Sequence, residues 1–164
     1  MSFRIEPARP RDVPQVLALV RALAEYEKLT HLVSGTEAQL HDELFGERPV
    51  IECVLGWEDA QAVGFALYFH NFSTFLARRG LYLEDLFVVP AARGRGHGKA
   101  LMQHLAQLAV ERGCGRFEWS VLDWNQPSID FYRSIGAELL PDWRTCRMTG
   151  SALASFASRS PRTP

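Results

Sequence analysis

Seven consecutive residues in the middle of the chain have the composition of an anion-binding loop. They follow the apolar run of residues 81–89 and open an amphipathic segment that continues to Arg112. A strand that leads through glycines into a helix leaves the N–H groups of the first helical turn without partners, at the positive end of the helix dipole. Glycines also let a ligand approach this backbone closely. The seven residues are Arg93, Gly94, Arg95, Gly96, His97, Gly98 and Lys99.

Two common phosphate-binding loops are excluded by the spacing. A Walker loop needs Ser or Thr after its Gly-Lys pair, but Ala100 follows Lys99, and Arg93 stands where the first glycine belongs. The dinucleotide fingerprint G-x-G-x-x-G also fails, because the three glycines are spaced by two throughout and the loop lies mid-chain. The pattern that fits is R-x-x-G-x-G. A flexible turn or an Arg-Gly patch that touches RNA is the alternative, and the position between strand and helix favours the anion site.

This pattern, preceded by Leu-Glu-Asp-Leu-Phe-Val-Val at residues 83–89, resembles the coenzyme A loop of the GNAT superfamily of N-acetyltransferases. Residues 125–137 are similar to the other signature of that superfamily, N-x-x-[AS]-x-x-[FL]-Y-x-x-x-G. Three short stretches resemble the branch that acetylates diamines, polyamines and thialysine; they are residues 24–28, 63–66 and 81–85. The resemblance covers about residues 3–148.

The resemblance implies an enzyme that moves the acetyl group of acetyl-CoA directly to a primary amine of a small cation. That cation would be a lysine-like amino acid such as thialysine, or a diamine or polyamine. The loop of residues 93–99 would hold the pyrophosphate, and a backbone N–H in the preceding strand would polarise the thioester carbonyl. The pantetheine arm would meet backbone groups of Leu86, Phe87 and Val88, and from a neighbouring element Asn125 and Ser128.

Tyr132, in the second signature, is the candidate general acid. The resemblance implies that it faces the acetyl-CoA sulfur. A phenol with an ordinary pKa of about 10 can protonate a departing thiolate whose conjugate acid has a pKa near 8.5. Taken without the signature, Tyr132 would fit an amphipathic core position with its hydroxyl at the surface.

Two adjacent acids, Glu84 and Asp85, interrupt an apolar strand. Alternation places them on opposite faces, so at least one must find water or a partner, and an ion pair with Arg78 or Arg79 would be a purely structural explanation. An alkylammonium with a pKa near 10.4 must lose its proton before it attacks, at a cost of about 4 to 5 kcal/mol at pH 7. In the resembled branch the glutamate collects that proton through water. This role is implied for Glu84, and Asp85 would anchor a cation.

Acidic residues near the end of the first predicted helix suit a cationic substrate. Tyr26 and Glu27, with Glu25, are the candidates, and a solvated helix face is the alternative. Residues 71–75 lack the carboxylate that polyamine enzymes carry there, which favours a lysine-like amino acid whose own carboxylate would meet Arg78 or Arg79. A protein lysine or N-terminal acetyltransferase, and a non-catalytic coenzyme A-binding regulatory module, stay open as alternatives.

Composition sets the class of protein. A chain of 164 residues that is 47% hydrophobic suffices for one domain with a full core. We expect an N-acetyltransferase domain at residues 1–157 and a mobile tail at 158–164.

A net charge of −1 and the lack of an apolar stretch of about 20 residues argue against nucleic acid and membrane partners. Three cysteines without paired spacing predict free thiols in the cytoplasm, five scattered histidines predict no metal site, and the resemblance implies a homodimer.

The order of predicted elements indicates an α/β fold. Strand, helix, strand order around the loop predicts a parallel pair within a mixed sheet. The resemblance implies a GNAT-like single domain: a twisted mixed sheet of about six to seven strands, helices on both faces and central parallel strands splayed around the cofactor. We expect strands at residues 3–7, 49–57, 61–71, 81–89, 116–122 and 137–149, and helices at about 12–28, 36–46, 99–112 and 127–134.

Overall fold

A computed structural model describes residues 2–159 of the chain. The chain divides into two compact units, the first ending at Ser120 and the second beginning at Val121. Of the predicted tail, residues 160–164 lie outside the described residues.

The first unit is built on a five-stranded sheet in the spatial order β1-β2-β3-β4-β5. The first four strands pair antiparallel, and β4 pairs parallel with β5. The predicted parallel pair around the loop is therefore confirmed. The strands are β1 (Phe3–Pro7), β2 (Glu52–Glu58), β3 (Gln61–Ser73), β4 (Arg78–Val88) and β5 (Phe117–Trp119).

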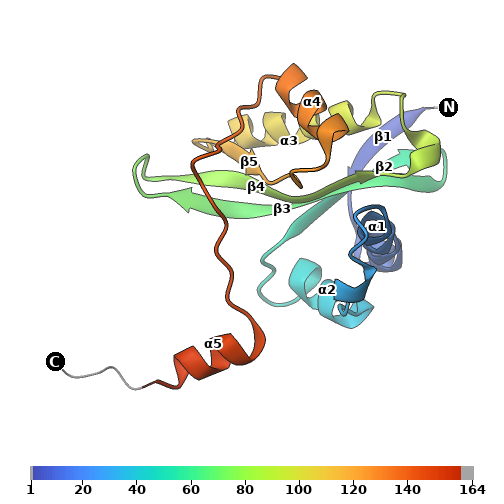
Figure 1. Cartoon of the computed structure of the whole chain (residues 1–164). Helices are drawn as coiled ribbons and strands as arrows, with labels where there is room; N and C mark the ends of the chain where they lie inside the picture. Colours follow the sequence, from blue (N-terminus) through green and yellow to red (C-terminus); the bar gives the residue numbers. More distant parts are fainter. Residues whose placement is uncertain (1, 160–164) are drawn as a thin grey trace. The chain divides into compact units, whose positions relative to one another are not determined.

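Helices α1 and α2 cover one face of this sheet, and α3 covers the other (Figure 1). In α1, apolar side chains recur every three or four residues, and those at Val16 and Leu23 are buried against the sheet. The predicted capping box is present at the start of α2, where Thr36 Oγ1 accepts from the backbone N–H of Gln39 at 3.2 Å. The helices are α1 (Val13–Tyr26), α2 (Glu37–Phe45) and α3 (His97–Glu111), with 3-10 turns at Pro10–Asp12, Thr30–Leu32 and Pro90–Ala92.

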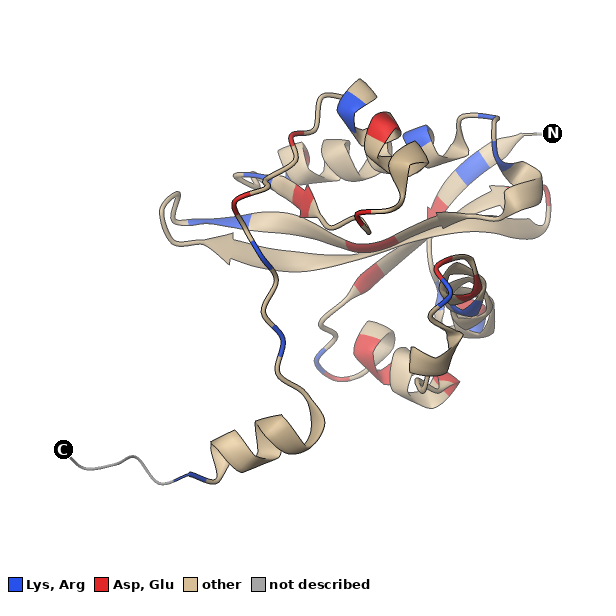
Figure 2. Cartoon of the chain, in the orientation of Figure 1, with Lys and Arg blue, Asp and Glu red and all other residues tan. Residues whose placement is uncertain are grey.

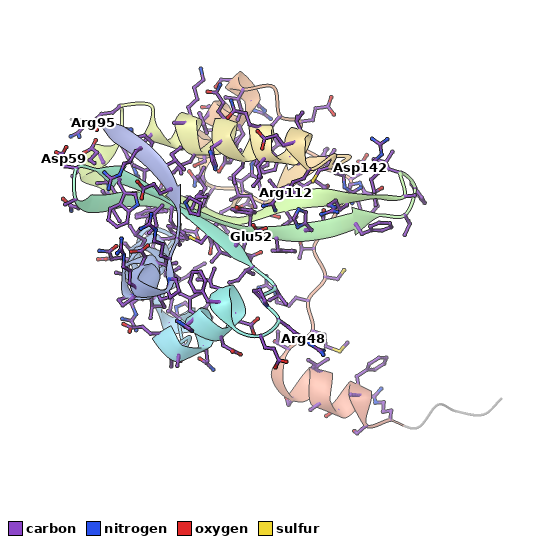
Figure 3. All side chains as sticks on the ribbon, turned by 180° about the vertical axis from the view of Figure 1, so that it is seen from behind. Arg48, Glu52, Asp59, Arg95, Arg112 and Asp142 are labelled. Atoms are coloured by element: carbon purple, nitrogen blue, oxygen red, sulfur yellow. The ribbon has the colours of Figure 1, made fainter. Side chains whose placement is uncertain are left out.

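An ion pair ties the C-terminal end of α3 to the sheet (Figure 3). The Arg112 guanidinium donates to both carboxylate oxygens of Glu52 in β2, at 2.6 and 2.7 Å. These hydrogen bonds hold the pKa of Glu52 below its ordinary value. Together with the fully buried Leu101 and Leu105, they fix the helix whose other end forms the glycine loop.

One residue of β4, Glu84, has no partner on β3. Leu67 pairs with Asp85 and the next residue, Tyr68, pairs with Leu83, so Glu84 forms a β-bulge. Because side chains alternate, Tyr68 and Leu83 share one face of the sheet, and Leu67 and Asp85 share the other. Leu67 belongs to the core beneath α1. The bulge therefore aims Asp85 toward the α1 side, although Leu83, two residues earlier, faces α3.

The parallel pairing of β5 stops at the same point. Its register runs from Leu81 opposite Phe117 to Leu83 opposite Trp119. Beyond Leu83, no described strand pairs with that edge of β4. The last five residues of β4 therefore offer a row of backbone N–H and C=O groups along one edge.

The second unit contains two helices, α4 (Gln126–Ser134) and α5 (Gly150–Ala157). The predicted helix at residues 127–134 is confirmed, but the predicted strand at 137–149 is wrong, because those residues form no strand. A strand needs a neighbour to complete its ladder, and Pro141 cannot donate to one. The sheet therefore has five described strands instead of six to seven, and α5 was not predicted.

Deleting Glu84 tests the bulge. We expect the deletion variant to unfold cooperatively within about 1 kcal/mol of the wild type, because Leu83 and Asp85 keep their partners and faces once the unpaired residue is removed. Deleting Tyr82 instead removes a regular ladder residue and turns one buried leucine outward, with an expected loss of about 2 to 5 kcal/mol. Urea unfolding of both variants measures this, and equal losses would show that Glu84 is a regular ladder residue.

Candidate active site

The glycine loop has the geometry of an anion site. Gly94 and Gly96 adopt left-handed conformations with φ of 77° and 83°, which favour glycine. The first backbone hydrogen bond of α3 runs from Ala100 N–H to Gly96 O at 2.9 Å, so the N–H groups of residues 97–99 precede the helical ladder. A Cβ placed on Gly94, Gly96 or Gly98 would meet nothing within 4 Å. Glycines at these positions leave the backbone N–H groups without a neighbouring side chain, as a phosphate site requires.

Two side chains of the loop are held by a carboxylate from the β2–β3 turn. Arg95 Nη1 donates to both oxygens of Glu58 at 2.8 Å, and His97 Nε2 lies 2.5 Å from Glu58 Oε1. The hydrogen bonds from His97 and then Arg95 lower the pKa of Glu58. The ring of Phe3 stacks on His97 at 3.9 Å. Figure 3 shows Arg95 beside this turn, where Asp59 follows Glu58. Sequence reasoning missed Glu58, because only the fold brings it to the loop.

Arg93, the first residue of the loop, is folded back toward α1. Its Nε donates to Val88 O at 2.8 Å, and its backbone N–H donates to Pro90 O at 3.2 Å. Its guanidinium carbon lies 4.5 Å from the ring centre of Tyr26 and 5.3 Å from that of Phe87. Because Nε is already bonded, only the two Nη groups of this guanidinium remain available to a ligand.

The predicted acidic residues gather where β4 meets the end of α1, and Figure 2 marks the acids in the middle of β4. Burial, followed by the charges of Glu84 and Glu27, raises the pKa of Asp85 to about 6. Burial also raises the pKa of Glu27. Glu84 itself is exposed. Two carboxylates are thus partly removed from water without a described ion-pair partner, which suits an incoming cation.

The ion pair considered as a structural explanation for these acids is absent from residues 2–159. Neither Arg78 nor Arg79 pairs with Glu84 or Asp85. Arg79 lies six residues from Asp85 along β4, about 20 Å at the rise of a strand. A lysine-like substrate held at Asp85 therefore cannot reach either arginine with its carboxylate, and the expectation for Arg78 and Arg79 does not fit the register.

The remaining predicted residues occupy β4 and the second unit. Leu86, Phe87 and Val88 form the end of β4, beside the unpaired edge. Asn125 is buried and caps α4, where its Oδ1 accepts from Ser128 N–H at 3.4 Å. Tyr132 lies on α4 and is half-buried, with its ring centre 5.4 Å from that of Phe131.

Residues 2–159 contain neither a metal-binding cluster nor a helix that could span a membrane. No group of three or more His, Cys, Asp or Glu side chains there is placed to hold a metal ion. No helix in the same range has the length and apolar character to cross a membrane.

A mixed sheet whose bulged, acidic strand leads into a glycine loop at a helix N-terminus is compatible with an acyltransferase that uses a phosphate-bearing donor. The family model of the acetyltransferase (GNAT) family matches residues 17–137, so the chain belongs to this family. The family resemblance drawn from the two sequence signatures is therefore confirmed. Acetyltransferases of this family take their acetyl group from acetyl-CoA.

Relatives of known activity match almost the whole chain. A thialysine N-epsilon-acetyltransferase of Mus musculus is 35% identical over 169 residues, covering 96% of this chain and 99% of the relative. An L-ornithine N5-acetyltransferase of Arabidopsis thaliana is 33% identical, with 95% and 88% covered.

Solved structures agree on the fold. An integron cassette protein from the mobile metagenome of V. cholerae matches with a TM-score of 0.82 and 29% identity, covering 97% of this chain and 99% of that one. An aminoglycoside acetyltransferase from an uncultured soil metagenomic sample matches with a TM-score of 0.76 at 20% identity, covering 91% and 100%, and so shows the fold alone.

The buried acid predicts a stability difference that depends on pH. Because folding raises the pKa of Asp85 from 3.8 to about 6, the folded state binds more protons, and stability falls as the pH rises through this window. We expect Asp85→Asn to remove the penalty and to stabilise the protein at pH 8 by up to about 3 kcal/mol, with no gain at pH 3. Unfolding curves across pH measure this. The control is Glu111→Gln, an exposed acid on α3 that is not among the charges raising the pKa of Asp85, and it is expected within about 0.5 kcal/mol of wild type at pH 8. An Asp85→Asn protein no more stable than wild type at pH 8 would contradict the burial cost.

A charge placed in the glycine loop tests the donor site. We expect Gly96→Asp to abolish acetyl-CoA binding in calorimetry, because it adds a side chain and a negative charge beside the N–H groups that would hold the pyrophosphate. Gly113→Asp is the matched control, since Gly113 also has a positive φ of 66° and an open Cβ position, but lies beyond the other end of α3. A negative charge is more favourable at a helix N-terminus than at a helix C-terminus, so Gly96→Asp should be at least as stable as Gly113→Asp. If only Gly96→Asp loses acetyl-CoA binding, the loss is therefore not caused by instability. If both variants bind acetyl-CoA with the same affinity, the donor does not bind at the glycine loop.

Proposed function

We propose that this protein transfers the acetyl group of acetyl-CoA to the side-chain amine of a lysine-like amino acid, such as thialysine or ornithine. The observation that carries the proposal is the pair of half-buried acids, Glu27 and Asp85, beside the exposed Glu84. Relatives that acetylate thialysine and ornithine support the same class of acceptor. Diamines and polyamines are the second candidate acceptors, favoured by the acidity of this cluster.

The donor would bind along the loop and the open edge of β4. Backbone N–H groups of residues 94–99 would hold the pyrophosphate, and Lys99 adds an exposed positive charge. Backbone groups of Leu86 and Val88 would pair with the pantetheine arm, because no described strand occupies that edge. An N–H on the same edge would polarise the thioester carbonyl. Further contacts to this arm are proposed for Phe87, Asn125 and Ser128.

Glu84 would accept the proton of the substrate ammonium through water. The bulge leaves this side chain exposed, whereas Asp85 is turned toward α1. Asp85, Glu27 and Tyr26 would hold the cationic substrate beside it. The free amine then attacks the thioester carbon, the carbon–sulfur bond breaks and an amide forms as the nitrogen releases its second proton to solvent. No covalent enzyme intermediate forms.

Tyr132 would donate a proton to the departing thiolate, as a phenol can in a site that excludes water. This role rests on the second sequence signature, within the family match to residues 17–137.

We also propose that the protein is a homodimer and acts in the cytoplasm. The second unit exposes large apolar side chains at Leu140, Trp143 and Phe156, which a second copy would cover. The cysteines are unpaired throughout the described residues, as suits a reducing compartment. Sedimentation at equilibrium tests the dimer.

Replacing the tyrosine hydroxyl tests the general acid. We expect Tyr132→Phe to lower kcat by about 10² to 10⁴-fold and to leave acetyl-CoA affinity unchanged, because the ring is kept and only the proton donor is lost. Tyr82→Phe is the control; it removes a hydroxyl that bonds Ser120 at 3.0 Å and is expected to keep kcat within threefold. A Tyr132→Phe enzyme as active as this control would remove Tyr132 from the mechanism.

A panel of acceptors tests the proposed reaction. Release of the coenzyme A thiol is measured with thialysine, ornithine, lysine, putrescine, spermidine and a lysine peptide. We expect kcat/KM for thialysine or ornithine to exceed that for spermidine by at least about tenfold. Spermidine carries a third ammonium, and residues 71–75 contain no carboxylate to bind it. Spermidine as the best acceptor would favour the polyamine alternative, and the peptide as the best acceptor would favour a protein acetyltransferase. Acetyl-CoA binding without turnover of any amine would indicate a regulatory module.

A further inference from the structure

An arginine borders the acidic cluster. The Arg93 guanidinium lies over the rings of Tyr26 and Phe87, at 4.5 and 5.3 Å from their centres. Tyr26 directly precedes Glu27, and Phe87 follows Asp85 by two residues on the same face of β4. One positive group thus lies on the α1 side of the sheet, over two rings whose residues are close in sequence to the acids Glu27 and Asp85.

This guanidinium is positioned but not neutralised. Its Nε donates to Val88 O at 2.8 Å, and the two aromatic rings fix its plane. Its two Nη groups make no hydrogen bond or ion pair with any of residues 2–159, and the residue is exposed. An arginine with one edge anchored and the other edge free is arranged to receive a carboxylate with two parallel hydrogen bonds.

The spacing along β4 is compatible with an amino acid. Asp85 and Phe87 are about 7 Å apart along the strand, and the Arg93 guanidinium carbon lies 5.3 Å from the ring centre of Phe87. Extended thialysine spans about 7 to 8 Å from its carboxylate carbon to its terminal nitrogen, and a hydrogen bond at each end adds about 3 Å. An amine beside Glu84 and Asp85 would therefore direct the carboxylate of the same molecule toward Arg93 and its α-ammonium toward Glu27.

We propose that the free edge of Arg93 binds the α-carboxylate of the acceptor and so selects lysine-like amino acids over diamines and polyamines. This inference rests on the proposed function, acetyl transfer to a small amine. A diamine or polyamine would place no anion at Arg93, and a further ammonium there would be repelled. The sequence pattern assigned Arg93 to the pyrophosphate and assigned the carboxylate to Arg78 or Arg79, whereas the register places Arg79 about 20 Å from Asp85.

The test compares two acceptors that differ only in the carboxylate. Thialysine and bis(2-aminoethyl) sulfide, its decarboxylated form, are assayed at saturating acetyl-CoA with wild type, Arg93→Met, Arg93→Lys, Arg79→Met and Lys28→Met. We expect wild type to prefer thialysine, Arg93→Met to reduce that preference in kcat/KM by about 10- to 100-fold, and Arg93→Lys to keep part of it. Arg79→Met and Lys28→Met are expected to keep the full preference; Lys28 is the exposed cation that follows Glu27.

The ratio is taken within one preparation, so it does not depend on how much of a variant is folded or on its affinity for the donor. An Arg93→Met enzyme with an unchanged ratio, even if its KM for acetyl-CoA rises, would return Arg93 to the donor site and overturn this inference alone. Loss of the preference in Arg79→Met or Lys28→Met, but not in Arg93→Met, would also overturn it. A wild-type enzyme that acetylates neither compound would overturn the proposed function and this inference with it.

Discussion

Because Glu84 has no partner on β3, the residues that follow it in β4 face opposite to where a regular ladder would place them. In a regular strand Asp85 would share the face of Leu83 and lie under α3. The extra residue turns Asp85 and Phe87 toward the end of α1, where Tyr26 and Glu27 are. The parallel ladder to β5 ends at Leu83, so the same short stretch also exposes a backbone edge. The side chains proposed to bind the acceptor and the edge proposed to bind the donor thus arise at one point of the sheet.

The acids gathered at this point work against the stability of the protein. Burial and neighbouring charges raise the pKa of Asp85 to about 6, and burial raises that of Glu27, so neither group gains from folding at neutral pH. The core around them is otherwise apolar, with Phe65 and Leu55 fully buried. A cation that enters this cluster offsets the cost, and an uncharged competitor does not. Selectivity for a charged acceptor and reduced stability of the free protein therefore have the same origin.

Features encoded by neighbouring residues could be predicted from the sequence, whereas those that depend on distant partners could not. The glycine spacing of residues 93–99 and the Thr36–Gln39 capping box act within one helical turn, and both appear where expected. The bulge depends on the register with β3, so alternation alone placed Glu84 and Asp85 on opposite faces without revealing where β5 pairing ends. Glu58 stands 39 residues before His97, and its contact with the loop leaves no local signal. The strand expected at residues 137–149 is absent, because a strand depends on a neighbouring strand that local sequence does not reveal.

The contacts of Glu58 determine how the loop attracts its ligand. Arg95 and His97 are both bound to this one carboxylate, so two of the four basic side chains in the loop are paired, while Arg93 and Lys99 stay exposed. Unpaired cations attract anions over a Debye length of about 8 to 10 Å, and salt weakens that attraction, whereas the N–H dipoles act only at short range. Salt should therefore weaken anion binding at this loop less than at a loop whose basic side chains were all unpaired. Unrelated polyanions should also be attracted less.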